Sequence, residues 1–473
     1  MVSAFDPLSV GSLELSNRLA VPAMVTRLSG EDGFVNEPIV ERYRRFAEGG
    51  VGLIVVEASA IHESRSGPLL RVSSDEFVPG LERVTQACHS AGPAKVFLQI
   101  IHFLKIARSG WRQKIADLGV DDLEVLPGLF ADAAERAALA GFDGVELHMA
   151  HAYTLSSFLS RQNRRRDEYG RTLENRLRLP TAVMQAVTER VGDFPVSVRF
   201  NADEAIRRGY SVDDAAVFAV RFADLGAAYV SLSVGGKFED AVHRDGEPLY
   251  PYTGFSGDRC MPGSNYPDAV NIWMARSVRR ELRAAGHDTP VLGTGKIGSV
   301  ELADRVLDDE SCDIVGMARA LLADPYLPAK ARDGRVDETV RCIYCNVCKS
   351  LDGSFKTVVC YLWPAGATQA PRPGESTESE LLWTNDKPLN ATLRPGEVRL
   401  SWPAADGGAT GYDLMRSTDG GTFDRITACT RTRHLDDRAL SGHRYQYRVV
   451  PYDSAGRRGQ ASNRVEVDLM ADQ

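Results

Sequence analysis

The alternation of short apolar runs with amphipathic segments, over about the first 330 residues, constrains the fold of this chain most strongly. The runs are rich in β-branched residues and are short enough to be strands: Leu19–Val21, Gly52–Glu57, Val96–Ile101, Gly144–His148, Val196–Phe200, Tyr229–Ser233, Pro290–Gly293 and Asp313–Met317. The segments between them have the apolar spacing of surface helices, and several end at glycine: Pro38–Gly49, Leu129–Gly141, Leu173–Val191, Asp213–Gly226 and Ala269–Gly286. Eight strands that alternate with helices over this length predict an α/β fold, a TIM (β/α)8 barrel over residues 1–335.

A doubly wound open sheet is the alternative arrangement of the same elements. Its dinucleotide-binding form carries a G-x-G-x-x-G turn directly after the first strand, where the backbone must approach a pyrophosphate. No such motif follows Leu19–Val21. The sequence therefore favours the barrel.

The last part of the chain has a different pattern. Residues 365–382 are rich in Ala, Pro, Gly, Ser, Thr and Glu without periodicity, which is typical of a linker. Residues 383–468 then alternate apolar and polar positions, with turn signals at intervals of roughly 8–12 residues, as in an all-β sandwich. This segment resembles a fibronectin type III domain, in which Trp402 and Tyr445 would be core residues.

Four cysteines, Cys342-x2-Cys345-x2-Cys348-x11-Cys360, give the strongest chemical signal. Two overlapping C-x2-C units can surround one corner of a cluster with three sulfurs, and a distant fourth thiolate completes a [4Fe–4S] site. Zinc is the alternative, although zinc sites more often use two well-separated C-x2-C pairs. We therefore assign residues 336–364 to cluster binding and expect the remaining cysteines to be ordinary packed residues: Cys88, Cys260, Cys312 and Cys429.

Charge and composition restrict the partners. The formal net charge of −8, from 56 basic and 64 acidic residues, argues against nucleic acid or an anionic membrane surface. No apolar run is long enough to span a membrane, and the start of the chain lacks the regions of a signal peptide. We expect a cytoplasmic protein, in which clustered cysteines indicate a metal centre rather than disulfides.

Several further motifs occur in a fixed order along the barrel: Phe5–Leu8, Asn17–Met24, Gly141–Tyr153, Asn163–Gly170, Leu173–Arg176 and Asp313–Pro325. Together they resemble the Old Yellow Enzyme (NADH:flavin oxidoreductase) family over residues 5–365. With the cysteine cluster added, the chain is most similar to the iron–sulfur branch that includes 2,4-dienoyl-CoA reductase and trimethylamine dehydrogenase. The resemblance implies an FMN-binding barrel.

The resemblance also implies which residues hold the cofactor. Gln99 would bond the edge of the flavin ring, and Arg199 would lie near flavin N1 and O2, although a barrel-mouth salt bridge is an alternative role for this arginine. Barrel enzymes commonly bind phosphate at the loops after strands seven and eight, where small residues expose backbone N–H groups. The cofactor-binding set is then Ala23, Met24, Gln99, Arg199, Gly295, Ala318 and Arg319.

The implied catalytic residues are His148, His151 and Tyr153. In the family, the matching histidines bond a substrate carbonyl oxygen and the tyrosine delivers a proton, while reduced FMN transfers hydride from N5 to an activated C=C bond. His151 could instead satisfy a buried carbonyl group. The family's Gly-Arg pair after strand three is replaced by Leu104 and Lys105, which leaves the substrate class open.

The leading hypothesis is an FMN/[4Fe–4S] enzyme that reduces, or in reverse desaturates, an activated C=C bond of a small molecule. Oxidative cleavage of an amine and a non-catalytic scaffold with a binding module are the alternatives. Because a sandwich rather than a nucleotide-binding domain follows the cysteines, an external electron-transfer protein or reductase is the expected partner. Homo-oligomer formation and the role of the sandwich stay open.

Overall fold

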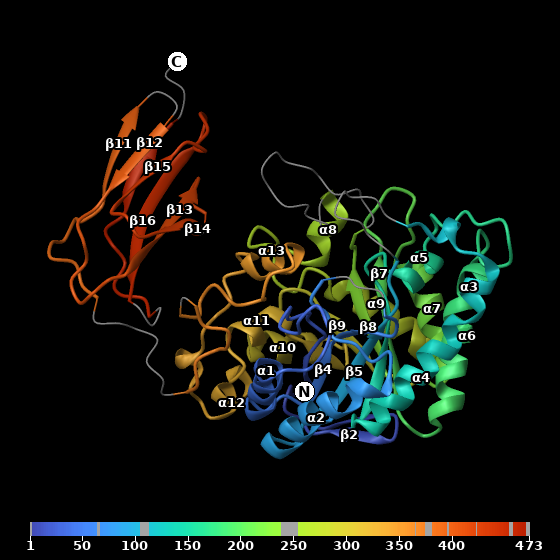
Figure 1. The fold of residues 1–473 in the computed structure, drawn as a ribbon. Helices are drawn as coiled ribbons and strands as arrows, with labels where there is room; N and C mark the ends of the chain where they lie inside the picture. The colour runs from blue at the N-terminus through green and yellow to red at the C-terminus, as the bar shows by residue number, and fades with distance from the viewer. Residues whose placement is uncertain are drawn as a thin grey trace. The chain divides into compact units, whose positions relative to one another are not determined.

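The computed structural model describes residues 2–63, 67–104, 113–237, 254–364, 366–373, 381–394, 397–421, 423–453 and 457–469. Internal contacts divide the chain into two compact units, Met1–Cys360 and Tyr361–Gln473, which are described separately (Figure 1). The ends of the predicted barrel at residue 335, of the cluster-binding segment at residue 364 and of the linker at residue 382 stay predictions. None of the described helices is long and apolar enough to cross a bilayer.

The first unit is a closed parallel barrel, which confirms the predicted fold class and excludes the open sheet. Its strands close in the order β10-β3-β4-β5-β6-β7-β8-β9. Their bounds are β3 Leu19–Val21, β4 Leu53–Ala60, β5 Lys95–Ile101, β6 Gly144–Met149, β7 Val196–Asp203, β8 Val230–Val234, β9 Val291–Thr294 and β10 Ile314–Gly316.

Helices surround this barrel, and most lie between consecutive strands (Figure 1). Local sequence fixes several of their starts: Asn36 accepts the N–H of Ile39 at the start of α1, and Thr172 accepts the N–H of Asn175 at the start of α6. The helices of at least nine residues are α1 Glu37–Glu48, α2 Val78–Ala91, α4 Leu126–Leu139, α6 Leu173–Val191, α7 Val212–Asp224, α9 Ile272–Ala284 and α10 Val300–Asp308. The shorter ones are α3 Val120–Glu124, α5 Thr154–Leu159, α8 Gly254–Cys260, α11 Ala318–Ala323, α12 Leu327–Arg332 and α13 Val347–Gly353.

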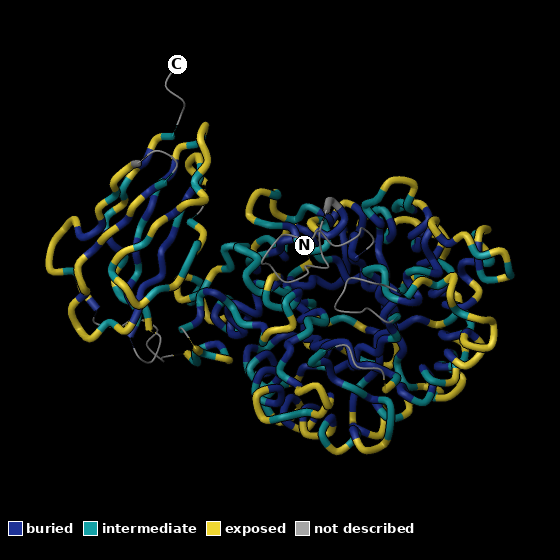
Figure 2. The backbone as a smooth tube through the Cα atoms, turned by 45° about the horizontal axis from the view of Figure 1, so that its top comes forward, coloured by how far each residue is buried: buried dark blue, intermediate teal, exposed yellow. Residues whose placement is uncertain are grey.

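A hairpin closes the amino-terminal end of the barrel. It consists of β1 (Leu8–Val10) and β2 (Leu13–Leu15), and its buried Val10 and Leu15 pack into one cluster with apolar residues of the strands. The barrel strands themselves are almost completely buried, whereas exposed residues lie in the peripheral helices and loops (Figure 2). The carboxyl ends of the strands are therefore the open end, where barrel enzymes have their sites.

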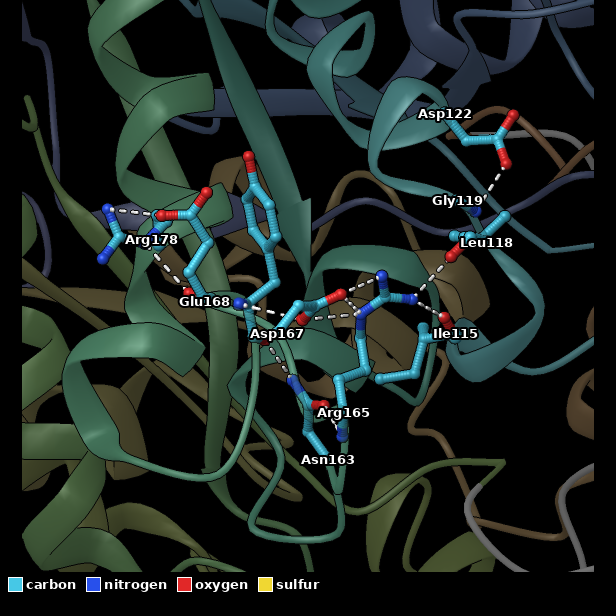
Figure 3. Close-up of polar contacts among 10 residues, drawn as sticks. Ile115, Leu118, Gly119, Asp122, Asn163, Arg165, Asp167, Glu168 and Arg178 are labelled. Atoms are coloured by element: carbon cyan, nitrogen blue, oxygen red, sulfur yellow. Dashed lines mark hydrogen bonds and ion pairs between the residues drawn. The ribbon is translucent and has the colours of Figure 1, made fainter.

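The segment after α5, residues 163–170, is held in place by polar contacts within itself and with the segment before α3 (Figure 3). Arg165 pairs with Asp167 and donates to the carbonyl oxygens of Ile115 and Leu118, the latter at 2.8 Å. Asn163 donates through its amide nitrogen to the carbonyl oxygen of Tyr169 at 2.7 Å. The motif Asn163–Gly170 therefore has a structural role: it fixes the backbone of residues 115–118, directly before α3.

The second unit consists of two antiparallel sheets, as the fold class predicts. One sheet has the order β11-β12-β15 and the other β14-β13-β16-β17. Trp402 and Tyr445 are buried in their common core, and the Tyr445 hydroxyl accepts the N–H of Leu440 at 2.9 Å. The bounds are β11 Asn390–Arg394, β12 Glu397–Ser401, β13 Gly411–Thr418, β14 Asp424–Cys429, β15 Arg433–Asp436, β16 Arg444–Tyr452 and β17 Val465–Asp468.

Candidate active site

A cavity of about 730 Å³ lies at the carboxyl ends of the barrel strands. Its volume is within the range of small-molecule and cofactor sites. The structure brings together in its wall every residue that the sequence assigns to the flavin or to the reaction: Ala23, Met24, Gln99, His148, His151, Tyr153, Arg199, Gly295, Ala318 and Arg319.

A buried carboxylate, Glu146, contacts Gln99 in the wall of this cavity. It accepts hydrogen bonds from the Gln99 amide at 2.6 Å and from the Tyr229 hydroxyl at 2.9 Å. Burial raises the pKa of Glu146, and the nearby charge of Arg199 opposes this shift. Because one N–H of the Gln99 amide is bonded to Glu146, its second N–H and its carbonyl oxygen are left to bond a ligand. Glu146 carried no separate signal in the sequence beyond its place in strand β6.

His148 and His151 lie side by side, with ring centroids 5.3 Å apart. The N–H of Ala150 donates to His148 Nδ1 at 3.2 Å, so the neutral ring carries its proton on Nε2. Burial, and then the charge of Arg199, lower the pKa of His148 to about 3. Burial likewise lowers the pKa of His151, whose Nε2 lies 2.6 Å from Ser233 Oγ. Both rings are therefore neutral near pH 7.

Tyr153 completes the predicted trio, with its ring centroid 5.1 Å from that of His148. Its hydroxyl oxygen accepts a hydrogen bond from Lys237 Nζ at 2.8 Å. Lys237 was not predicted from the sequence. The available signal was its place directly beyond strand β8, where barrel enzymes carry functional residues.

The opposite side of the cavity has the backbone openings that a phosphate site requires. Gly295 has φ +142°, and a Cβ there would lie 2.9 Å from the Cβ of Asn271. At Gly316 a Cβ would lie 2.6 Å from Thr294 Cγ2. Among the described residues, the buried Asn271 Oδ1 has no hydrogen-bond partner. These small residues fit a cofactor with a phosphate tail, whereas the Asn271 oxygen, as an acceptor, suits a hydroxyl or N–H donor of that cofactor.

Arg319 is held at this side by three contacts. Its guanidinium donates to the Pro262 carbonyl at 2.7 Å and to Asn346 Oδ1 at 2.6 Å, and it lies 4.8 Å from the ring centroid of Tyr344. Asn346 stands between two of the clustered cysteines, so this arginine connects the predicted phosphate side with the cysteine segment.

The cavity also has an apolar wall. Ala58, Leu69, Ile101 and Phe103 line the cavity and form a cluster in which Tyr153 takes part. Leu104 also lines the cavity, whereas Lys105 lies outside the described residues. The cavity therefore combines one polar corner with one apolar wall.

The four clustered cysteines are described, and none is in a disulfide. Tyr344 and Asn346, which lie between them, have φ of 55° and 56°, so the backbone turns sharply here. The N–H of Tyr344 donates to Cys342 Sγ at 3.4 Å, and Cys348 lines the cavity. As placed, the described residues include no group of three or more Cys, His, Asp or Glu that could hold a metal ion. The donor types suit a cluster and the placement does not, so the ligand set stays a prediction.

The fold and the groups in the cavity define a class, the FMN-dependent oxidoreductases. Residues 3–245 match the NADH:flavin oxidoreductase / NADH oxidase family, and the chain belongs to that family, which confirms the resemblance to Old Yellow Enzyme. The NADH oxidase of Thermoanaerobacter brockii is 31% identical over 72% of this chain and 52% of its own length. The chain thus spans about half of this curated relative.

Two solved structures share the fold. A complex of 2-naphthoyl-CoA reductase with 2-naphthoyl-CoA has a TM-score of 0.66 at 21% identity and covers 81% of this chain and 60% of its own. Histamine dehydrogenase from Rhizobium sp. 4-9 has a TM-score of 0.63 at 24% identity and covers 81% and 56%. The two TM-scores are nearly equal, so the fold alone does not distinguish the activity of a 2-naphthoyl-CoA reductase from that of a histamine dehydrogenase.

Proposed function

We propose that this protein reduces, or in reverse desaturates, a C=C bond that is activated by a neighbouring carbonyl group. One observation carries the proposal. Two neutral histidines, one with its proton fixed on Nε2, lie beside a tyrosine in the wall of a cavity that fits a flavin. The neutral N–H donor of His148 at this place suits an oxygen that becomes negative during the reaction.

FMN would be held by Gln99 at the ring edge, by Arg199, and on its phosphate side by Gly295, Ala318 and Arg319, with Ala23 and Met24 beside it. When bound, it supplies the hydride. His148 and His151 then hold the carbonyl oxygen of the substrate and lower the energy of the developing enolate. Tyr153 delivers a proton to the carbon next to the carbonyl group, a role that typically contributes about 10²–10⁴-fold to a rate.

Oxidation of an amine is the second candidate, because an amine dehydrogenase shares the fold. A positively charged or neutral amine offers no carbonyl oxygen to His148 and His151. The charge of Lys237 in the same corner also disfavours a cationic substrate. These contacts support the carbonyl substrate.

We further propose that Cys342, Cys345, Cys348 and Cys360 hold a [4Fe–4S] cluster that exchanges electrons with an external protein in the cytoplasm. The cysteine spacing supports this ligand set, and zinc is its competitor. Iron and sulfide analysis of protein purified without oxygen tests it directly. Four irons per chain are expected, together with an electron paramagnetic resonance signal after chemical reduction of the cluster, and stoichiometric zinc would contradict the proposal.

The reaction itself is tested with reduced protein mixed with a panel of enones, enoyl thioesters and methylated amines. We expect flavin reoxidation by one of the first two classes. In Tyr153→Phe this rate should fall by about 10²–10⁴-fold. Tyr169→Phe is the matched control, because Tyr169 packs on Phe158 outside the cavity. Flavin bleaching by methylated amines alone would favour the second candidate.

A further inference from the structure

Lys237 is fixed beside the catalytic trio by its backbone. Its N–H donates to the carbonyl oxygen of His151 at 3.2 Å, and the preceding Gly236 pairs with His151 as a β-bridge. The approach is close enough that a Cβ at Gly236 would lie 2.4 Å from the Cα of His151. Only glycine at this position lets the chain bring the lysine to this corner.

The side chain of Lys237 is aimed at Tyr153. Its Nζ lies 2.8 Å from the phenolic oxygen and 4.9 Å from the ring centroid, and the residue is only 9% exposed. An ammonium group has donors and no acceptor, so the tyrosine oxygen must accept this bond. The O–H proton of Tyr153 is therefore directed away from the lysine, and both residues line the cavity.

Four other ionisable groups among the described residues of this cavity, His148, His151, Cys260 and Arg199, do not replace Lys237 as a proton source. Burial keeps His148 and His151 neutral by lowering their pKa, to about 3 for His148. Burial raises the pKa of the Cys260 thiol to about 11. Arg199 is charged but does not give up its proton in proteins. Lys237 is the group among these that both contacts Tyr153 and can exchange a proton.

We propose that Lys237 positions the Tyr153 proton and replaces it after transfer. This inference rests on the proposed reduction. Bound FMN would supply two electrons as hydride to one carbon of the C=C bond; as this π bond is lost, the Tyr153 O–H bond breaks and a second C–H bond forms on the neighbouring carbon. The tyrosine oxygen is left negative, and an N–H bond of Lys237 breaks to re-form the O–H bond. The resulting neutral amine takes its proton back from water.

The experiment compares Lys237→Met and Lys237→Arg in full-length, flavin-loaded protein. Reduced enzyme is mixed with 2-cyclohexenone as the probe, and reoxidation is followed in H2O and D2O. In K237M the rate should fall by about 100-fold and the solvent isotope effect should rise, with unchanged affinity for the probe. K237R keeps a charged donor, so it should recover part of the rate. Lys95→Met is the control, because Lys95 pairs with Asp143 at the start of strand β5.

A second measurement needs no turnover. The near-ultraviolet absorbance of tyrosinate is titrated in resting protein, and the contribution of Tyr153 is isolated by subtracting the titration of Tyr153→Phe. In K237M this contribution should emerge at higher pH than in the wild type, because a neighbouring positive charge is lost. If no alkene reoxidises the enzyme but this shift occurs, the proposed reaction is wrong and the positioning role stands. If K237M leaves both the isotope effect and the titration unchanged, the role of Lys237 is refuted.

Discussion

At the scale of single residues, burial keeps the histidines at the carboxyl ends of the barrel strands neutral. His148 is 4% exposed and lies near the positive charges of Arg199 and Lys237, so its protonated form is disfavoured twice. Its Nδ1 is already occupied by the Ala150 N–H, which leaves Nε2–H as the donor. The burial that keeps this ring neutral also lowers the free energy of unfolding at acidic pH, because the ring can bind a proton in the unfolded chain but not in the folded one.

The folded pKa of His148 is about 3, whereas a free histidine titrates near 6.5, so between these values the unfolded state binds the extra proton. Stability therefore falls as the pH drops from 7 to 5, by about 2 kcal/mol from this residue. Glu57 contributes with the opposite sign, because burial raises its pKa to about 7 and the folded state binds its proton first.

We predict that His148→Asn loses about 2 kcal/mol less than the wild type between pH 7 and pH 5. Asparagine can still accept the Ala150 N–H, but it does not ionise. Chemical denaturation at the two pH values, followed by circular dichroism, measures the difference. Comparing variant with wild type removes the contribution of Glu57, which both share. Equal losses in the two proteins would mean that His148 is not buried as a neutral ring.

At the scale of elements, the barrel strands could be predicted because most of them are short runs dominated by apolar and β-branched residues, as buried parallel strands usually are. All eight predicted runs overlap the barrel strands of the structure, and β3 has the predicted bounds. The hairpin β1–β2 was missed, since each of its strands has a polar, exposed residue at its centre and therefore offers no apolar run. The site was predictable where a residue belonged to a motif, as with His148. Lys237 lay outside the motifs, and Glu146 lay in one without an assigned role, because the roles of both arise from contacts with residues distant in the chain.

The ends of strands β9 and β10 support a prediction about cofactor binding. Gly295→Ala places a methyl group 2.9 Å from the Asn271 Cβ in a backbone conformation that favours glycine, so the loop must shift. We expect its FMN affinity to fall at least about tenfold, equivalent to about 1.4 kcal/mol. Titration of flavin-free protein with FMN, followed by flavin fluorescence, measures it.

Gly128→Ala is the matched control for this substitution. Gly128 is exposed in α4, and a Cβ there meets nothing within 4 Å. Alanine should therefore leave the FMN affinity unchanged and stabilise the helix by up to about 1 kcal/mol. Wild-type FMN affinity in G295A would show that the phosphate does not bind at this loop.

At the scale of the whole molecule, two units with separate cores follow one another along the chain. The sequence placed a linker at 365–382, of which residue 365 and residues 374–380 lie outside the described part. Residues before this linker, Tyr361 and Trp363, already make contacts with the strands and loops of the second unit. The Tyr361 ring lies 5.0 Å from the guanidinium carbons of both Arg425 and Arg458, and Arg458 also donates to the Trp363 carbonyl. A composition-based boundary misses such contacts, because they join residues about 60–100 positions apart in the chain.

These contacts predict where the second unit begins. Its own hydrophobic core includes Trp402 and Tyr447, so a fragment of residues 361–473 should fold into β structure on its own. A fragment of residues 366–473 lacks Tyr361 and its two cation–π contacts. We expect it to be less stable by about 2–4 kcal/mol, from the lost aromatic packing and these contacts. Urea denaturation of the two fragments measures the difference.

Single substitutions in the longer fragment separate the contribution of Tyr361 from that of chain length. Tyr361→Ala should reproduce most of the loss, since it removes the ring between Arg425 and Arg458 and the hydroxyl that contacts the Met415 sulfur at 2.7 Å. Leu382→Ala removes a side chain that is 56% exposed and should change the unfolding midpoint little. If the shorter fragment and Y361A both unfold at the same urea concentration as the longer fragment, the unit begins after residue 365. The segment directly after Cys360 would then act as a connector that contributes nothing to the stability of the sandwich.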